Sequence, residues 1–192
     1  MEYMFLGERI SPYLVFTNSH DGSGAAKVAL TPVRVVCNNT LNLALKDAKR
    51  SFSMQHTGDV DGKLQDARDT LVLAGRYMDS RGEEFEKLRK IPLSDKKVME
   101  YIRLLIPEAE GMTPQQKKNI KRMQEGLSIR YFDAPDLAGV GKNAYRFINA
   151  ASDFATHAEP IRKTRNYREN VFARTIGGNP LVDQAYNLVQ AA

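Results

Sequence analysis

Residues that form covalent cross-links and metal centres are scarce in this chain. Its 192 residues include one cysteine, three histidines and no tryptophan. A single cysteine excludes an internal disulfide and is typical of a protein from a reducing compartment. The histidines lie far apart, and none has a partner at the spacing of a zinc finger, a calcium loop or an HExxH site. We therefore expect no metal, no cofactor and a cytoplasmic location.

Long hydrophobic runs are also absent. No apolar stretch approaches the roughly 20 residues that a membrane-spanning helix requires. The N-terminal segment MEYMFLGERISPYLVF lacks the basic region and the small-residue cleavage site of a secretory signal. Hydrophobic residues make up 42% and charged residues 27% of the chain, as in an ordinary folded protein. This length and composition predict a single soluble domain over residues 1–192 with no membrane partner.

The first third of the chain has the pattern of β-strands. Two β-rich runs, residues 13–19 and 25–36, flank a segment with the dipeptide Asp-Gly, which is typical of turns. Pro32 has no amide hydrogen to donate, so we expect it at a sheet edge or at a break in the second run. Residues 51–57 alternate polar and apolar side chains, which predicts a further strand.

The stretch TPVRVVCNNTLNLAL, residues 31–45, predicts a strand that leads into a helix. Asn38, Asn39 and Thr40 are residue types that cap helix N-termini through their side-chain oxygens. Cys37 stands at this junction, where a helix dipole lowers the pKa of a thiol. No general base accompanies it at a recognisable spacing, so we interpret Cys37 as a small buried apolar residue. Arg34 is expected on the opposite face of the strand or at an edge.

Helical periodicity dominates the remainder of the chain. Apolar residues recur every three or four positions over residues 60–88, which predicts a long helix with a kink near Gly82. Ser94 or Asp95 is expected to cap the next helix, which should end before Pro107.

Further helices are expected towards the C-terminus. Thr113 and Pro114 predict a helix start, because proline favours the first helical position. Residues 143–159 predict another helix, and the tail predicts two shorter helices separated by GGNP. The expected fold class is α+β: a small antiparallel sheet, made of the hairpin plus one or two strands, followed by a helical majority. Residues 1–58 would form the β-rich part with one helix, and residues 59–192 the helical part.

No group of residues in the sequence meets the requirements of a catalytic site. The segment GVGKN, residues 139–143, lacks the spacer and the Ser/Thr of a Walker loop, so we interpret it as a flexible helix start. Asp153 and His157 lie one helical turn apart and could bind a metal or form a surface hydrogen bond. The hydrogen bond is the commoner outcome, and we predict that the protein is not an enzyme.

Positive charge gathers in two segments of a chain whose formal net charge is +5. Residues 117–130 stack like charges at i,i+4, which repel each other without an anionic partner. Residues 162–174 interleave basic residues with Tyr167 and Phe172, as in single-strand binding, where rings stack on bases. A solvated basic face with two core aromatics is the alternative. The predicted binding residues are Lys117, Lys118, Lys121, Arg122, Arg130, Arg162, Lys163, Arg165, Tyr167, Arg168 and Arg174.

Four segments of the chain carry a family resemblance. They are FTNSHDGSGA, TPVRVVCNNTLNLAL, HTG and the C-terminal run GKNAYRFINAASDFATHAEPIRKTRNYRENVFARTIGGNPLVDQAYNLV. Together they resemble an uncharacterised family of phage- and plasmid-borne proteins. The resemblance implies a mobile-element protein that acts in the bacterial cytoplasm, on DNA or against host defence. Family members usually carry more sequence before the hairpin, so we expect a second copy of the chain to supply strands in a homodimer.

Two classes of function follow from these features. The first is a non-enzymatic accessory protein of a phage or plasmid that binds nucleic acid, preferably single-stranded DNA, through its basic helices. The second is a protein-binding inhibitor of a host antiviral defence system, such as an anti-CRISPR protein, which would present its positive surface to an acidic host protein. The sequence does not separate these two classes.

Overall fold

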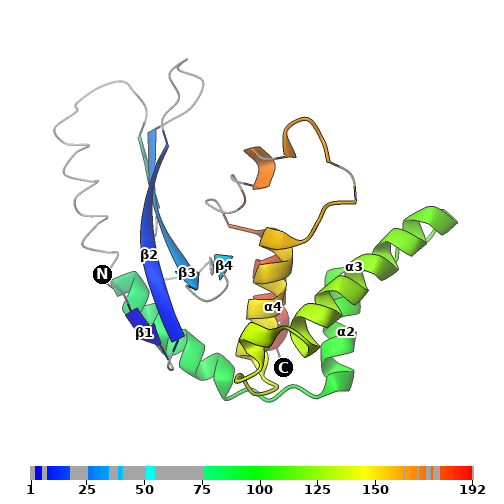
Figure 1. The fold of residues 1–192 in the computed structure, drawn as a ribbon, viewed down its shortest axis with the longest axis horizontal. Helices are drawn as coiled ribbons and strands as arrows, with labels where there is room; N and C mark the ends of the chain where they lie inside the picture. Colours follow the sequence, from blue (N-terminus) through cyan, green and yellow to red (C-terminus); the bar gives the residue numbers. More distant parts are fainter. Residues whose placement is uncertain are drawn as a thin grey trace. The chain divides into compact units, whose positions relative to one another are not determined.

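Helices make up most of the residues that the structure describes, which confirms the predicted helical majority (Figure 1). The structure is a computed structural model. It describes residues 3–5, 8–17, 26–34, 39–40, 51–54, 76–161, 163–167, 169–171, 174 and 178–191. The chain divides into two compact units, Met1–Glu84 and Phe85–Ala192, and each is considered by itself below.

The described strands belong to the first unit and pair in antiparallel fashion. They are β1 (Tyr3–Phe5), β2 (Glu8–Thr17), β3 (Ala26–Arg34), β4 (Asn39–Thr40) and β5 (Ser51–Met54). Their order is β1-β2-β3-β4, and β5 also pairs with β3. The longest ladder joins β2 to β3, from Ile10 opposite Arg34 to Thr17 opposite Lys27. The Asp-Gly turn expected between these two strands lies outside the described residues.

Pro32 lies inside β3 without ending it. It stands opposite Pro12 of β2, so two residues that lack amide hydrogens face each other. On the other side of β3, β5 pairs as far as Ala29 and β4 pairs from Val33 onwards. Pro32 therefore falls in a stretch that neither of these strands pairs, where a missing amide removes no bond to them.

The predicted helix start at Asn38, Asn39 and Thr40 is wrong for the last two residues. Asn39 and Thr40 form β4 and pair with Arg34 and Val33. Asparagine favours tight turns as well as helix caps, and the backbone here finds its partners in the preceding strand. Asn38, Cys37 and the helix expected after Thr40 lie outside the described residues, as do the side chains of β3.

The described helices end close to the expected residues. Residues 76–89, which include the boundary between the two units, are helical without a break at Gly82. The expected start of this helix near residue 60 lies outside the described residues. Helix α2 (Asp95–Leu105) begins after Ser94, whose side-chain oxygen accepts a hydrogen bond from the Lys97 amide. Its Val98, Tyr101, Ile102 and Leu105 side chains are buried, which confirms the apolar stripe read from the sequence.

Helix α3 (Pro114–Phe132) begins with a reciprocal cap. The Thr113 side chain accepts from the Gln116 amide, and the Gln116 side chain accepts from the Thr113 amide. Only Leu127 and Tyr131 of this helix are buried. A helix that lies along a core buries a residue every three or four positions, so the first half of α3 projects beyond the core (Figure 1).

Helix α4 (Ala144–His157) forms the core of the second unit. The Asn143 side chain caps it by accepting from the Arg146 amide, and its first ten residues are all buried. Helices α3 and α6 (Pro180–Gln190) both pack against it, and a short 3-10 helix, η1 (Pro135–Leu137), lies between α3 and α4 in the chain.

A buried arginine of α4 holds the end of α3 in place. Nε of Arg146 donates to the Tyr131 carbonyl at 2.6 Å, and Nη2 donates to the Phe132 carbonyl at 3.1 Å. Nη1 donates to the carbonyls of Leu137 at 2.9 Å and of Val140 at 2.7 Å. The last carbonyls of a helix have no intrahelical partner and carry its negative dipole end, so a guanidinium satisfies both needs. The role of Arg146 is structural.

Candidate binding groove

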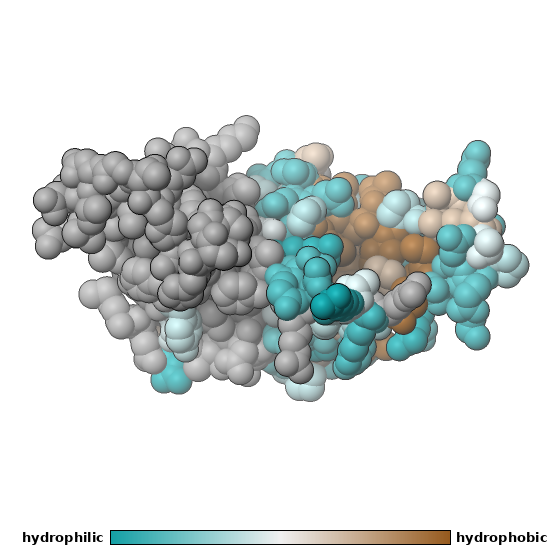
Figure 2. All heavy atoms as spheres, turned by 90° about the horizontal axis from the view of Figure 1, so that it is seen from above, coloured by the Kyte–Doolittle hydropathy of each residue, from teal (hydrophilic) through white to brown (hydrophobic). Residues whose placement is uncertain are grey.

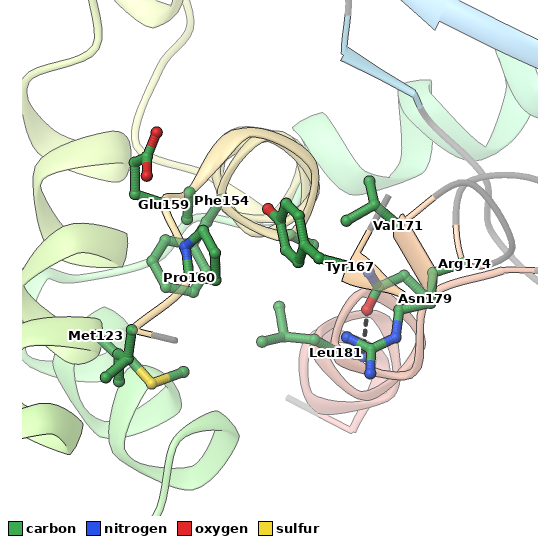
Figure 3. Close-up of a pocket in the computed structure, with 12 residues that line it drawn as sticks. Met123, Phe154, Glu159, Pro160, Tyr167, Val171, Arg174, Asn179 and Leu181 are labelled. Atoms are coloured by element: carbon green, nitrogen blue, oxygen red, sulfur yellow. Dashed lines mark hydrogen bonds between the residues drawn. The ribbon is translucent and has the colours of Figure 1, made fainter. Parts of the chain in front are cut away.

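A groove in the second unit brings together residues of α3, α4, α6 and the segment after α4. It consists of a larger cavity of about 400 Å³ and a smaller one of about 180 Å³. Both cavities are lined by Met123, Phe154, Ala158, Glu159 and Ile161, so they adjoin each other. We call the two together the α3–α4 groove (Figure 3).

The backbone at the end of α4 shapes this groove. Ala158 leaves the helix in an extended conformation, and the proline that follows cannot continue a helix. The chain therefore passes over the end of α4 instead of lengthening it. On α3, a Cβ added to Gly126 would lie 3.2 Å from Cε2 of Phe154, so the missing side chain lets this ring lie against the helix backbone.

Aromatic and aliphatic side chains line the larger cavity. Phe154 and Pro160 lie on one side and Tyr167 on the other (Figure 3). Tyr167 is half-buried, and the two aromatic rings make no contact with each other among the described interactions. The space between them suits a flat apolar group. The remaining apolar lining residues are Met123, Ala155, Ala158, Ile161, Val171 and Leu181.

Three arginines stand at the groove. Arg122 and Arg130 line the smaller cavity from α3, and Arg174 lines the larger cavity from the opposite wall. Arg130 lies eight positions after Arg122, which corresponds to about 12 Å along the helix. Among the described residues, Arg122 and Arg174 form no ion pair. Glu159 is the acidic residue of the lining, and its Oε2 lies 3.5 Å from Nζ of Lys163.

Arg130 is held by a buried carboxylate. Nη1 of Arg130 lies 2.6 Å from Oδ2 of Asp153, and the other oxygen of Asp153 lies 2.7 Å from Nδ1 of His157. The predicted hydrogen bond between Asp153 and His157 is confirmed, but its expected place at the surface is wrong for Asp153, which is buried. A buried carboxylate requires a charged or hydrogen-bonded partner, and Arg130 supplies it from 23 positions away in the chain.

The structure brings residues of both predicted basic segments to one groove. Arg122 and Arg130 come from the first segment, and Tyr167 and Arg174 come from the second. Lys118 and Lys121 are exposed on the projecting half of α3, and Arg165 is exposed too. Arg162, Arg168 and the predicted aromatic Phe172 lie outside the described residues or side chains.

Two of the predicted basic residues are engaged in exposed ion pairs. Nζ of Lys117 lies 2.9 Å from Oε1 of Glu108, and Lys163 pairs with Glu159. Exposed pairs contribute little to stability and exchange readily for another anion. In the GVGKN segment, Nζ of Lys142 lies 2.8 Å from Oδ1 of Asp95, so this lysine joins the start of α2 to the start of α4.

Sequence reasoning missed the apolar walls of the groove. Met123, Phe154 and Leu181 come from three different helices, and no spacing in the sequence connects them. Gly126 was the available signal, because a glycine inside a helix is costly and often marks a close packing contact. Figure 2 shows apolar residues of the described part gathered in a band between hydrophilic ones.

Two kinds of feature are absent from the residues that the structure describes: membrane-spanning helices and metal-binding clusters. None of the described helices is long and apolar enough to cross a membrane. Within the same part of the chain, no group of three or more histidine, cysteine, aspartate or glutamate side chains could hold a metal ion.

The described part of the chain is mainly helical and contains a groove lined by arginines and by apolar and aromatic side chains. Residues 2–175 match the family described as "Domain of unknown function (DUF932)", and the chain belongs to this family. No curated protein and no solved structure matches the chain.

Proposed function

We propose that the protein binds single-stranded nucleic acid in the α3–α4 groove and does not act as an enzyme. The observation that supports this proposal is the meeting of aromatic rings and arginines in one groove. Single-strand binding sites combine positive charge, which follows the phosphates, with rings on which the bases stack. Phe154 and Tyr167 supply the rings, and Arg122, Arg130 and Arg174 supply the charge.

The projecting half of α3 extends the positive surface beyond the groove. Lys118 and Arg122 are separated by one helical turn, as are Lys117 and Lys121, and all four are exposed. Like charges at this spacing destabilise a helix slightly, and a bound phosphate backbone would relieve the repulsion. These residues therefore favour an anionic polymer over a small anion, because a polymer can contact the groove and the projecting half of α3 together.

The proposed setting is a phage or plasmid protein that helps its element handle DNA. An acidic segment of a host protein is the competing occupant, since its carboxylates could pair with the same arginines. The aromatic lining favours nucleic acid, because every base offers a flat face for stacking and an acidic peptide segment does not.

Binding to a fluorescent oligothymidylate of about 16 nucleotides, the upper site size of single-strand modules, tests the proposal by anisotropy. Arg122→Gln and Arg174→Gln should each weaken binding several-fold, because each loses a phosphate contact. Arg103→Gln is the matched control, since Arg103 is exposed on α2 and lines neither cavity.

Two results of this titration would contradict the proposal. No binding at about 50 mM salt, a permissive concentration for phosphate contacts, would refute the proposal. Equal losses in Arg103→Gln and Arg122→Gln would show that net charge, and not the groove, causes the binding.

A further inference from the structure

We infer that the larger cavity of the groove holds one unstacked nucleobase between Tyr167 and Phe154. This inference rests on the proposed function. It specifies which part of the bound strand occupies the cavity. It predicts that the ligand is recognised as an unpaired nucleotide, and not merely as a chain of phosphates.

The size of the cavity fits one base with part of its sugar. Its volume is about 400 Å³, which lies at the lower end of the range for small-molecule sites, roughly 300–1,000 Å³. Its lining is mostly apolar, which suits the flat face of a base, while the polar edge of the base would keep its hydration by pointing out of the cavity. A row of stacked bases would need a longer platform than these two rings supply.

Local structure places both rings at the cavity. Phe154 lies against the α3 backbone at Gly126, where an added Cβ would come within 3.2 Å of its ring. Tyr167 follows a turn in which its amide donates to the Thr164 carbonyl at 3.1 Å. A preformed slot between two rings reduces the ordering that a base must impose when it binds.

The arginines lie where the phosphates on either side of the bound nucleotide would pass. Arg174 stands on the Tyr167 side of the larger cavity, while Arg122 and Arg130 line the adjoining smaller cavity. A strand that crosses the groove with one base pointing inwards would bring its backbone to both rims. A duplex keeps its bases paired and stacked, so it cannot present one base in this way without paying for unstacking.

The cavity offers little that would select one base over another. Oδ1 of Asn179 accepts from the Leu181 amide at 3.1 Å, so this oxygen already caps α6. Glu159 is exposed, and its carboxylate points away from the cavity in Figure 3. Stacking on an apolar slot is sequence-tolerant because all bases have an aromatic face. We therefore expect a site that distinguishes bases from abasic sugars but accepts any base.

A thermodynamic cycle between ring and base tests this inference. The affinities of wild-type protein and of Tyr167→Ala are measured for two strands of equal length, an oligothymidylate and an oligomer with abasic sugars at every position. Both strands keep the same phosphates, so only stacking distinguishes them. Removing the ring should cost about five- to 150-fold on the oligothymidylate, the equivalent of 1–3 kcal/mol per stacked base. It should change affinity for the abasic strand by less than about two-fold, within the error of additivity.

Two further variants separate stacking from a structural role of Tyr167. Tyr167→Phe keeps the ring and should restore most of the affinity for the oligothymidylate. Tyr13→Ala removes a tyrosine that is 56% exposed on β2 and should alter neither affinity. If Tyr167→Ala weakens both strands equally, the single-base site is wrong while the groove remains a phosphate-binding site. If wild-type protein binds neither strand, the inference and the proposed function both fail.

Discussion

Arg146 and Arg122 show how burial decides the role of an arginine in this protein. Arg146 is 8% exposed, and its guanidinium donates to four backbone carbonyls. Arg122 is exposed at the groove, where its guanidinium is accessible to a ligand. Both residues are arginines, so the sequence alone does not distinguish their roles. The packing of α4 against the end of α3 does.

Replacing Arg146 by lysine should destabilise the protein by at least about 2 kcal/mol, because hydrogen bonds from a charged donor are each worth roughly 1.5–3 kcal/mol. Lysine keeps the charge but lacks the planar fork that reaches several carbonyls at once. Urea unfolding measures the change, with Arg103→Lys as an exposed control that should stay within about 0.5 kcal/mol. A loss below about 0.5 kcal/mol for Arg146→Lys would show that the carbonyl contacts are weak.

Tyr131 should make stability fall in alkaline solution. Burial raises the pKa of its hydroxyl to about 12, although Arg146 lowers the pKa and Asp95 raises it. The unfolded chain, with a pKa near 10, loses this proton first as the pH rises. The contribution to stability is therefore complete below about pH 10, declines between 10 and 12 and is lost above 12, by about 2–3 kcal/mol in total.

Tyr131→Phe separates this effect from the titration of lysines. The hydroxyl has no hydrogen-bond partner among the described residues, so the variant should match wild-type stability at neutral pH within about 1 kcal/mol. Unfolding free energies at about pH 7 and 11 should diverge, with wild type losing more than the variant. An equal loss in both proteins would contradict a buried, titrating Tyr131.

At the scale of elements, the contact between α3 and α4 depends on Gly126. Gly126→Ala gains up to about 1 kcal/mol of helix propensity, but its Cβ would meet Phe154 at 3.2 Å and push the ring towards the cavity. Stability should change little because the two effects oppose each other, while affinity for oligothymidylate should fall several-fold. Unfolding and anisotropy on the same variant check both parts, and unchanged affinity would show that the ring position is unimportant.

Helix boundaries were predictable because capping is local. Ser94, Thr113 and Asn143 each accept a hydrogen bond from an amide three residues later, so the signal and its effect lie within one turn. Asn39 and Thr40 carry a similar signal, but pairing with β3 determines their structure. Such pairing depends on neighbours in space, which a short window of sequence does not contain.

The groove was predictable only in its charges. Clusters of lysine and arginine are visible in the sequence, and Arg122, Arg130 and Arg174 do reach the groove. The aromatic lining was not visible as a whole, because Phe154 and Tyr167 come to line one cavity only after the chain turns at the end of α4. Asp153, which orients Arg130, was singled out for its neighbour His157 instead.

At the scale of the whole molecule, the proposed binding surface lies in the unit Phe85–Ala192. The exposed lysines of the projecting half of α3 continue the positive charge of Arg122 along the same helix, which suits a linear anion. The expected homodimer, the cytoplasmic location and the mobile-element setting stay predictions. None of them is required for the groove to bind a strand, since every residue assigned to it comes from one chain.

The salt dependence of oligothymidylate binding tests the central claim most directly. Each phosphate that the protein neutralises contributes about −0.7 to the slope of log affinity against log salt on a single strand. Contacts by Arg122 and Arg174, the two groove arginines without an ion pair among the described residues, therefore predict a slope of about −1.4 or steeper. Arg122→Gln combined with Arg174→Gln should make the slope shallower by about 1.4. The Arg103→Gln control should leave the slope unchanged. A wild-type slope near zero, or the same slope in the double variant, would contradict binding of a nucleic-acid strand in the α3–α4 groove.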